Sequence, residues 1–375
     1  MHVGLNLVCL VPGEIGGMEV YARELIPRLV ALRPQWRFTA FVNREAADAG
    51  DNATWRDVVP TVTVPVRARS RVGWVRGEQQ FLPRLARRAG VDLVHSFAST
   101  APAWGPFRRV VTVHDLLYRV HPEAHFGVRS LGMRVLVPLA VRRSDRVIAV
   151  SHSTARDIQQ LLHVSNEKVD VVQNGVSPEV RAVPAPEGDL RAKHALGDRP
   201  VVLSVSAKRP HKNLVRLLDA IARVPSSRRP VLVVPGYPTP YERHLARRAS
   251  DLGIASDVRF LSWVEAAELE GLYALAACFV YPSLYEGFGL PVLEAMARGV
   301  PVACGDRSSL PEVAGDAALT FDPERVDAIA GAITRLLDDR ELAERLRQRG
   351  RARARQFTWD ATARGVLDAY DRTLA

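Results

Sequence analysis

The sequence holds little cysteine and almost no lysine. Its 375 residues include three cysteines, and only four of its 51 basic residues are lysines. Cys9, Cys278 and Cys304 each lie inside an apolar run, and an odd number in such settings argues against a disulfide framework or a cysteine metal cluster. We expect buried free thiols in a reducing compartment. Against the arginine-rich background, the lysines Lys208 and Lys212 stand out because they lie so close together.

Several motifs of nucleotide and metal chemistry are also missing. The sequence has no Gly-Lys dipeptide, and therefore no GxxxxGK[ST] phosphate loop; HExxH, paired CxxC, Asp-x-Asp and GxGxxG are not found either. No window offers about 18 uninterrupted apolar residues, the length that spans a bilayer. The apolar run 1–11 carries no basic n-region and no cleavage site. We expect a cytoplasmic protein without a spanning helix or a resident metal ion.

What the sequence does contain is a repeated α/β pattern. It is 47% hydrophobic and 25% charged, which allows ordinary packed cores, and its length favours two to three domains of about 150 residues. Short apolar runs alternate with helical stretches, which predicts parallel sheets covered by helices on both faces. The expected strands fall in two series, at 2–11, 38–42, 91–97, 110–114, 147–150 and 169–173, then at 201–206, 231–235, 258–261, 278–281 and 302–304.

The pattern predicts two domains. We place the first at 1–182 and the second at 200–356, with a linker at 183–199 that holds at most one short helix, because that stretch is rich in proline, glycine and charge. We expect the helical segment 357–375 to pack back on the first domain. In open parallel sheets, ligands bind beyond the carboxyl ends of the strands, so two such domains facing each other would hold a substrate in the cleft between them.

Two glutamates mark the strongest candidate site. Glu286 and Glu294 lie eight positions apart, the first in a glycine-rich loop after the expected strand 278–281 and the second near a helix start. A carboxylate in the first turn of a helix interacts favourably with the helix dipole and so stabilises the helix. It can also accept hydrogen bonds from the hydroxyl groups of a ribose or hexose. The free N–H groups of such a helix start can bind an anion. Between the two glutamates stand the glycines Gly287 and Gly289, which permit close backbone approach, and the apolar Phe288 and Leu290.

Other candidate residues also follow expected strands. Lys208, Arg209 and Lys212 stand between a strand and an apolar helix, where cations can neutralise a diphosphate; a solvated charged loop is the alternative. Gly16-Gly17 occupies the first strand-to-helix turn, where backbone can approach an anion. His114 ends an apolar strand, a position that is structural in many proteins but lies on the ligand-binding edge of this fold.

These segments resemble the retaining glycosyltransferases of family 4, known as glycosyl transferases group 1, which have the GT-B fold. The segment PSLYEGFGLPVLEAMARGVPV resembles their E-x7-E motif, and PGEIGGMEVYARELIPRL resembles their opening Gly-Gly loop. Other landmarks appear in the family's order: VVTVHDLLYRVHPEAH, SDRVIAVSHSTARDI, VDVVQNGVSPE and GDAALTFDP. The resemblance covers nearly the whole chain and is closest to bacterial mannosyl- and rhamnosyltransferase-type members.

The resemblance implies an α/β, GT-B protein with two Rossmann-like parallel-sheet domains facing across a cleft. It implies a metal-independent, retaining transfer of a hexose from a GDP-mannose-like, UDP- or dTDP-sugar to a hydroxyl group of a glycan, lipid-linked saccharide or small molecule. No cofactor beyond the donor is expected. Retention would follow from attack on the leaving group's own face, or from double displacement through an enzyme nucleophile.

Residue by residue, the resemblance implies that Glu286 and His114 are catalytic and hold the donor sugar, and that Glu294 accepts hydrogen bonds from the ribose. Many members carry an arginine five positions before the phosphate-binding lysine, where this chain has Ala207. Either Lys208 or Arg209 would then supply the missing charge. The full donor-binding set implied is Gly16, Gly17, Lys208, Arg209, Lys212, Trp263, Gly287, Phe288, Gly289, Leu290 and Glu294.

Other functions remain open at this point. A nucleotide-sugar epimerase or phosphorylase-like enzyme could share the GT-B fold, and a sugar-nucleotide-binding protein without catalysis would leave the motif residues idle. A nucleic-acid-binding protein is suggested by the net charge of +10 and by arginines at every second position of 345–355. Such spacing cannot form one stripe on a helix, however, and no known nucleic-acid module is recognisable.

The excess of positive charge is concentrated in one part of the sequence. Residues 61–146 hold 15 arginines and five acidic residues, which equals the net charge of the whole chain. Arg84, Arg87 and Arg88 would share one helix face. A solvated surface is one interpretation; the other is peripheral contact with anionic lipid headgroups, or with a lipid-linked, phosphate-bearing acceptor.

Overall fold

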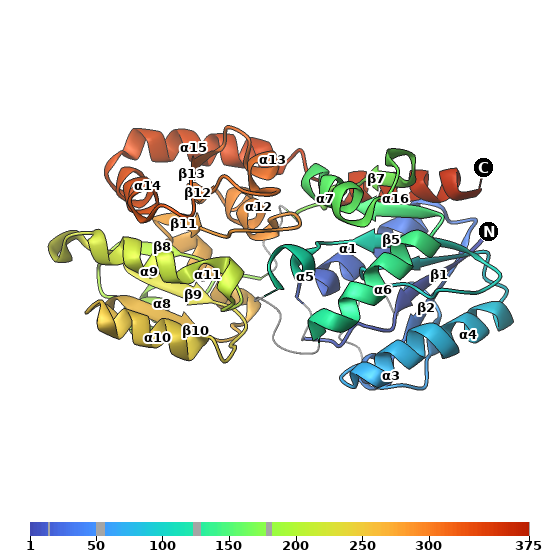
Figure 1. Cartoon of the computed structure of the whole chain (residues 1–375). Coiled ribbons are helices and arrows are strands. Elements are labelled where there is room, and N and C mark those ends of the chain that lie inside the picture. Colours follow the sequence, from blue (N-terminus) through green and yellow to red (C-terminus); the bar gives the residue numbers. More distant parts are fainter. Residues whose placement is uncertain (14–15, 50–56, 123–128, 178–181, 375) are drawn as a thin grey trace. The chain divides into compact units, whose positions relative to one another are not determined.

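The chain forms two units, each built around one parallel sheet. The first unit contains Met1–Gly175 together with Thr358–Ala375, and the second contains Val176–Phe357. In this computed structural model, the residues described are 1–13, 16–49, 57–122, 129–177 and 182–374 (Figure 1).

The sheet of the first unit has seven strands in the order β3-β2-β1-β4-β5-β6-β7. Strand β1 is buried along its whole length, as expected for a parallel strand covered on both faces. The strand order reverses between β1 and β4, so the loops after these strands lie beside each other at the carboxyl edge. The strands are β1 (His2–Leu7), β2 (Arg37–Val42), β3 (Thr61–Thr63), β4 (Leu93–Ser96), β5 (Arg108–Val113), β6 (Arg146–Ala149) and β7 (Val169–Val171).

Helices cover this sheet, and the C-terminal helix is one of them. Helix α16 packs along α1, burying apolar residues of both. Arg28 of α1 and Arg33, which caps its C-terminus, pair with Asp360 and Asp371 of α16, respectively. The helices are α1 (Gly17–Leu32), α2 (Arg44–Asp48), α3 (Arg71–Arg76), a π-helical turn (Gly77–Phe81), α4 (Leu82–Arg88), α5 (Leu117–Val120), α6 (Arg129–Arg143), α7 (His152–Leu162) and α16 (Trp359–Leu374).

The second unit repeats this plan with six strands in the order β10-β9-β8-β11-β12-β13. Here the order reverses between β8 and β11, which brings the loops after these two strands together. Strands β8 (Val201–Leu203), β9 (Val231–Pro235), β10 (Val258–Leu261), β11 (Cys278–Tyr281), β12 (Val302–Gly305) and β13 (Ala318–Phe321) form the sheet. Helices α8 (Glu187–Lys193), α9 (Leu214–Arg223), α10 (Glu242–Asp251), α11 (Ala266–Leu275), α12 (Leu290–Ala297), α13 (Leu310–Ala314), α14 (Val326–Asp338) and α15 (Arg340–Ala354) surround it.

The domain boundaries differ from those expected from the sequence. The chain divides after Gly175 rather than after residue 182, and the expected linker 183–199 contains α8, which belongs to the second unit. Leu190 of α8 is buried against Gly271 of α11, where a Cβ atom would lie 2.6 Å from a Leu190 methyl group. The prolines and glycines of this stretch therefore mark the turns around a short packed helix.

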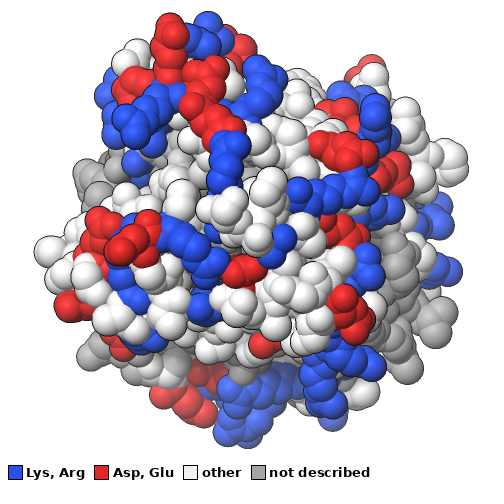
Figure 2. All heavy atoms as spheres, turned by 90° about the vertical axis from the view of Figure 1, so that its left-hand side faces the viewer, with Lys and Arg blue, Asp and Glu red and all other residues white. Residues whose placement is uncertain are grey.

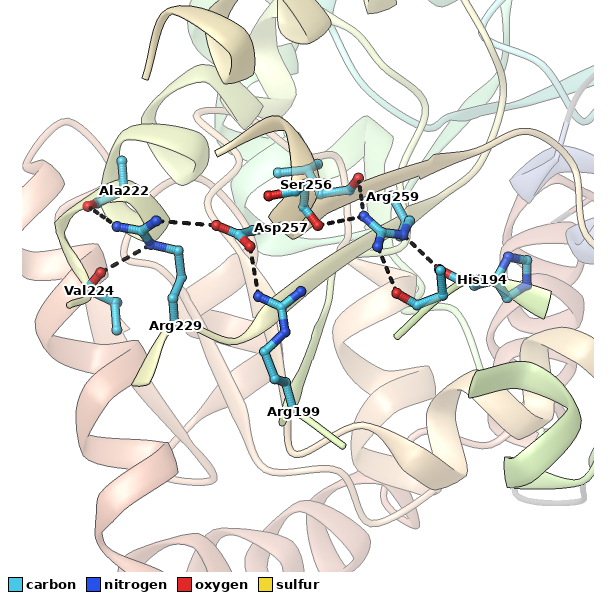
Figure 3. Close-up of polar contacts among 10 residues, drawn as sticks. His194, Arg199, Ala222, Val224, Arg229, Ser256, Asp257 and Arg259 are labelled. Atoms are coloured by element: carbon cyan, nitrogen blue, oxygen red, sulfur yellow. Dashed lines mark hydrogen bonds and ion pairs between the residues drawn. The ribbon is translucent and has the colours of Figure 1, made fainter. Parts of the chain in front are cut away.

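An aspartate and three arginines hold the amino edge of the second sheet together (Figure 3). Asp257, just before β10, accepts hydrogen bonds from Arg199 at 2.6 Å and from Arg229 at 3.2 Å. Arg259 donates to the backbone carbonyl of His194 at 2.6 Å. Burial opposes ionisation of Asp257, but the two paired guanidinium groups lower its pKa. These contacts join the segments that precede β8, β9 and β10.

Candidate active site

A lysine and a glutamate meet at the carboxyl edge of the second sheet. Lys212 lies in the loop after β8 and Glu286 in the loop after β11, the two strands at which the order reverses. The Lys212 ammonium is 2.6 Å from a carboxylate oxygen of Glu286, and both side chains are mostly buried. Two residues 74 positions apart, each singled out from the sequence, are thus brought into direct contact.

Tyr281 completes this cluster, and sequence reasoning did not assign it a role. The Lys212 ammonium donates to the Tyr281 hydroxyl at 2.9 Å. Burial and the Glu286 carboxylate raise the pKa of Tyr281 well above its usual value, so the phenol keeps its proton. As the last residue of the expected strand 278–281, Tyr281 carried a detectable signal: a polar-tipped side chain at the carboxyl end of a strand.

Helix α12 begins directly after this loop. Its N-cap residue, Gly289, has φ of 106°, and a Cβ atom there would lie 2.8 Å from a methyl group of Leu310, so glycine is required on both counts. Leu290 opens the helix and Pro291 follows it, which suits a first turn because the missing N–H has no partner to lose. The glutamate of the second motif position, Glu294, is half-buried in α12, with the Tyr273 hydroxyl 3.5 Å away.

Phe288 packs inside the second unit rather than facing solvent. It is buried and lies edge-to-face against Phe357, with ring centroids 5.9 Å apart. Its side chain therefore holds the loop in place, and only the backbone of this residue is available for the expected donor contact. Gly287, on the Glu286 side, is half-buried.

Lys208 departs from its expected donor-binding role. Its side chain is fully buried, and the ammonium donates to the carbonyl of Gly236 at 2.6 Å and to that of Leu261. Burial lowers the pKa of Lys208 to about 8, with the Glu242 carboxylate 3.9 Å away opposing the shift. The ammonium joins the loops after β8, β9 and β10 instead of facing outward toward a phosphate.

Arg209 and Trp263 remain accessible at the same edge. Among the residues that the structure describes, no hydrogen-bond or ion-pair partner is found for the half-buried Arg209 guanidinium. Trp263 is 65% exposed and lies edge-to-face with Tyr237 at 6.2 Å between ring centroids. The loop after β8 therefore presents Lys212 and Arg209, with an exposed indole on the loop after β10.

The remaining candidate residues belong to the first unit. Gly16 has φ of 48° and caps α1, which starts at Gly17, and no atom of the described residues lies within 4 Å of a Cβ placed on either glycine. His114 follows β5, and its Nε2 is 2.7 Å from the carbonyl oxygen of Phe97. Because a carbonyl only accepts, Nε2 carries a proton and Nδ1 of the neutral ring is an acceptor. Burial lowers the pKa of His114, which favours that neutral ring.

The three cysteines are free thiols. Cys278 and Cys304 are buried free thiols whose pKa burial raises to about 12, and Cys9 is a partly buried free thiol. Within the described ranges, no group of three or more His, Cys, Asp or Glu side chains could hold a metal ion. Over the same residues, no helix is long and apolar enough to cross a membrane.

Three arginines of the arginine-rich helix α15 are paired with acidic side chains. Arg345, Arg347 and Arg349 pair with Glu341, Glu344 and Asp316, respectively. Figure 2 shows basic and acidic side chains interspersed on the face of the second unit that it presents. This face of the second unit therefore does not show the basic stripe or patch that the nucleic-acid-binding alternative needs.

Comparison with known proteins gives one consistent family. The family Glycosyltransferase Family 4 matches residues 15–180, and Glycosyl transferases group 1 matches residues 187–353. The O-antigen chain mannosyltransferase B of Escherichia coli is 34% identical over 267 residues, covering 70% of this chain and 70% of that protein.

A second relative and a solved structure extend the likeness to the full length. A GDP-mannose-dependent alpha-(1-6)-phosphatidylinositol monomannoside mannosyltransferase of Mycobacterium tuberculosis is 29% identical over 392 aligned residues, covering 95% of each chain. The sucrose-phosphate synthase of Thermosynechococcus elongatus has a TM-score of 0.80 at 21% identity, covering 100% of this chain and 99% of that one. The chain therefore belongs to glycosyltransferase family 4, with the two Rossmann-like domains of the GT-B fold, and is a glycosyltransferase.

Proposed function

We propose that this glycosyltransferase moves mannose from GDP-mannose to a hydroxyl group of a glycan or lipid-linked saccharide, with retained configuration and without a metal ion. The observation that carries the proposal is the Lys212–Glu286 pair beside the start of α12. Mannose is supported by the names of both relatives, and GDP-mannose by that of the mycobacterial one. UDP- and dTDP-sugars are the competing donors.

The diphosphate of the donor would bind between the loop after β8 and the start of α12. Lys212 and Arg209 supply two positive charges, and the N–H groups of the first turn of α12 add the partial charge of a helix terminus. Together these groups can neutralise a departing diphosphate without help from a metal ion. Glu294 would accept hydrogen bonds from the ribose, and the exposed ring of Trp263 would contact the base.

Glu286 would hold the donor sugar at its reacting carbon. Its carboxylate is fixed by Lys212 and shielded from solvent, so it needs no reorganisation when positive charge develops on the sugar. The bond from C1 to the diphosphate oxygen breaks with its electron pair leaving on the diphosphate. The acceptor oxygen then bonds to C1 on the same face, and its proton passes to the diphosphate.

The first unit has candidate contacts of its own. The Nδ1 atom of neutral His114 can accept a hydrogen bond from a sugar hydroxyl, because Nε2 is committed to the Phe97 carbonyl. The open space around Gly16 and Gly17 allows close approach of a phosphate or sugar to the backbone. The acceptor would bind to loops of this unit, the part of such folds that varies with specificity.

The first unit would also contact an anionic membrane from the cytoplasmic side. Helices α3 and α4 and the segment before them expose their arginines, and Val72 of α3 is 78% exposed. The acidic residue of this region, Glu78, is buried. Exposed arginines and apolar side chains together are the features that bind anionic lipid headgroups. The exposed arginines are Arg67, Arg69, Arg71, Arg76, Arg84, Arg87 and Arg88.

Turnover of a donor panel tests the proposed reaction. We expect GDP-mannose to be used with a kcat/KM at least about tenfold above those of UDP- and dTDP-sugars, a discrimination of ordinary size for a base-contacting site. NMR of the product should show an axial mannosyl linkage, as in the donor, and activity should be unchanged in EDTA. An inverted product, or strict dependence on a divalent cation, would contradict the mechanism; preference for another donor would contradict the assignment of GDP-mannose.

A further inference from the structure

Two adjacent serines, Ser308 and Ser309, hold the backbone around Glu286. They lie in the loop after β12, just before α13. The backbone N–H of Glu286 donates to the Ser308 hydroxyl oxygen at 2.8 Å. The Ser309 hydroxyl lies 2.9 Å from the carbonyl oxygen of Glu286 and 2.7 Å from that of Phe288. The catalytic candidate is thus held at both of its backbone polar groups by residues more than 20 positions away.

The residues that precede Glu286 are held as well. The buried Ser283 hydroxyl lies 3.1 Å from the carbonyl oxygen of His211, and the N–H of Leu284 donates to the same oxygen at 2.9 Å. His211 neighbours Lys212, so this side of the loop is tied to the segment that carries the lysine. The Ser308–Ser309 pair fixes the other side, and the carboxylate of Glu286 meets Lys212 between them.

Ser308 holds its place at a conformational cost. Its φ is 51°, in the left-handed region that side chains rarely adopt and that glycine adopts freely. Glycine would therefore suit the backbone better at this position. Backbone strain of this kind persists where the surrounding structure gains something specific from the residue. What serine adds over glycine is the hydroxyl that accepts the Glu286 N–H.

We propose that Ser308 is a positioning residue for Glu286, kept at a backbone position suited to glycine because its hydroxyl sets where the Glu286 carboxylate lies relative to Lys212. Ser309 supports it by fixing the carbonyls of Glu286 and Phe288. This inference rests on the proposed role of Glu286 in glycosyl transfer. It predicts that Ser308 has opposite effects on activity and on stability. The hydroxyl raises kcat, whereas a side chain at this positive φ lowers the stability of the fold.

Substitution of Ser308 by glycine and by alanine tests this separation. Ser308→Gly removes the hydroxyl and relieves the strained φ, so we expect an unchanged or raised Tm but a kcat about five- to tenfold lower, the effect of one lost hydrogen bond. The donor KM should change less than about twofold, since Lys212 and Arg209 remain. Ser308→Ala keeps the strain, and should lose kcat to the same extent with no gain in Tm.

Ala195 provides the matched control. It also has a positive φ, of 48°, and lies in the turn after α8, away from the carboxyl edge. Ala195→Gly should raise Tm without changing kcat. If Ser308→Gly also keeps the wild-type kcat while the wild type is active, this inference is overturned and the proposed function stands. If the wild type transfers no sugar from any nucleotide-sugar donor, the proposed function fails and this inference fails with it.

Discussion

Lys208 and Lys212 lie four positions apart, and their ammonium groups have opposite environments. Lys208 points into the second unit and joins three loops through backbone carbonyls, whereas Lys212 reaches the carboxylate of Glu286. The sequence shows two cations in one loop and gives no means of telling them apart. The difference lies in their partners, the Gly236 and Leu261 carbonyls for Lys208 and the Glu286 carboxylate for Lys212, which only the folded sheet brings near.

Glu78 is a second residue whose role appears only in the fold. It lies in the π-helical turn of the first unit and is buried, accepting hydrogen bonds from Asn6 at 2.9 Å and from Thr100 at 3.0 Å. Burial raises the pKa of Glu78 to about 7, although the hydrogen bonds from Asn6 and Thr100 oppose the shift. A carboxyl with a raised pKa in the folded state binds its proton more tightly there than in the unfolded chain, where its pKa is near 4.5.

Stability should therefore fall as pH rises from about 4.5 through about 7, because the contribution of Glu78 is complete only below the unfolded pKa. Glu78→Gln keeps the shape and removes the charge. Urea unfolding should show it to be about 3 kcal/mol more stable than the wild type at pH 8 and nearly equal near pH 4.5, an order-of-magnitude figure from the size of the pKa shift.

A control of opposite sign is Glu45. Burial opposes its ionisation, but the backbone N–H groups of Arg69 and Ala68 lower its pKa, so its charged form stabilises the fold above the unfolded pKa. Glu45→Gln should be less stable than the wild type at pH 8. A Glu78→Gln variant that loses stability at both pH values would show that Glu78 is ionised and stabilising.

At the scale of elements, the structure shows that exposed positive charge of the first unit lies on helix α4. Arg84, Arg87 and Arg88 of α4 are exposed, as their spacing on one helix face predicts. The arginines of α15 are the contrast, because several of them pair with acidic neighbours. Two of these partners, Glu341 and Glu344, lie on α15 itself, whereas α4 has no acidic residue, so the helix sequences already separate a partly neutralised surface from a basic one.

Vesicle binding tests the surface of α4. At low salt, the wild type should sediment with vesicles that contain phosphatidylglycerol. It should not sediment with vesicles of phosphatidylcholine alone. Replacing Arg84, Arg87 and Arg88 together by serine should weaken binding about 100-fold, from about 1 kcal/mol for each arginine near an anionic surface. The matched control replaces three exposed arginines of the second unit, Arg340, Arg345 and Arg355. Equal effects of both triple variants, or binding that salt does not alter, would contradict a specific surface.

The elements that local chemistry defines were predictable from the sequence. Gly289 and Pro291 predict a helix start, and α12 begins at Leu290. The apolar runs predict the strands of both sheets except β3 and β13, since buried parallel strands have that pattern. The stretch 183–199 holds the short helix α8, but composition does not show that Leu190 packs against α11 and makes this stretch part of the second unit. The contacts of Tyr281 with Lys212 and of Ser308 with Glu286 could not be read from the sequence, because they join segments after different strands that only the sheet order brings together.

At the scale of the whole molecule, each unit reverses its strand order beside its central strand, and the candidate residues follow from that. Lys212 and Glu286 stand after β8 and β11, and Gly16 stands after β1. The GT-B fold thus has the same reversal of strand order in both of its domains. In the second unit, this reversal brings Lys212 and Glu286 into contact beside the start of α12.

The most direct test of the central claim compares sugar transfer with GDP binding in Glu286→Ala. We expect transfer from GDP-mannose to fall at least about 100-fold, the loss typical of a preorganised electrostatic group. GDP affinity, measured by calorimetry, should stay the same or increase, since Lys212 loses its carboxylate partner and remains available to the diphosphate. Glu344→Ala, which removes an exposed carboxylate of α15, should leave both quantities unchanged. An equal loss of transfer and GDP affinity in Glu286→Ala, or undiminished transfer, would contradict the account.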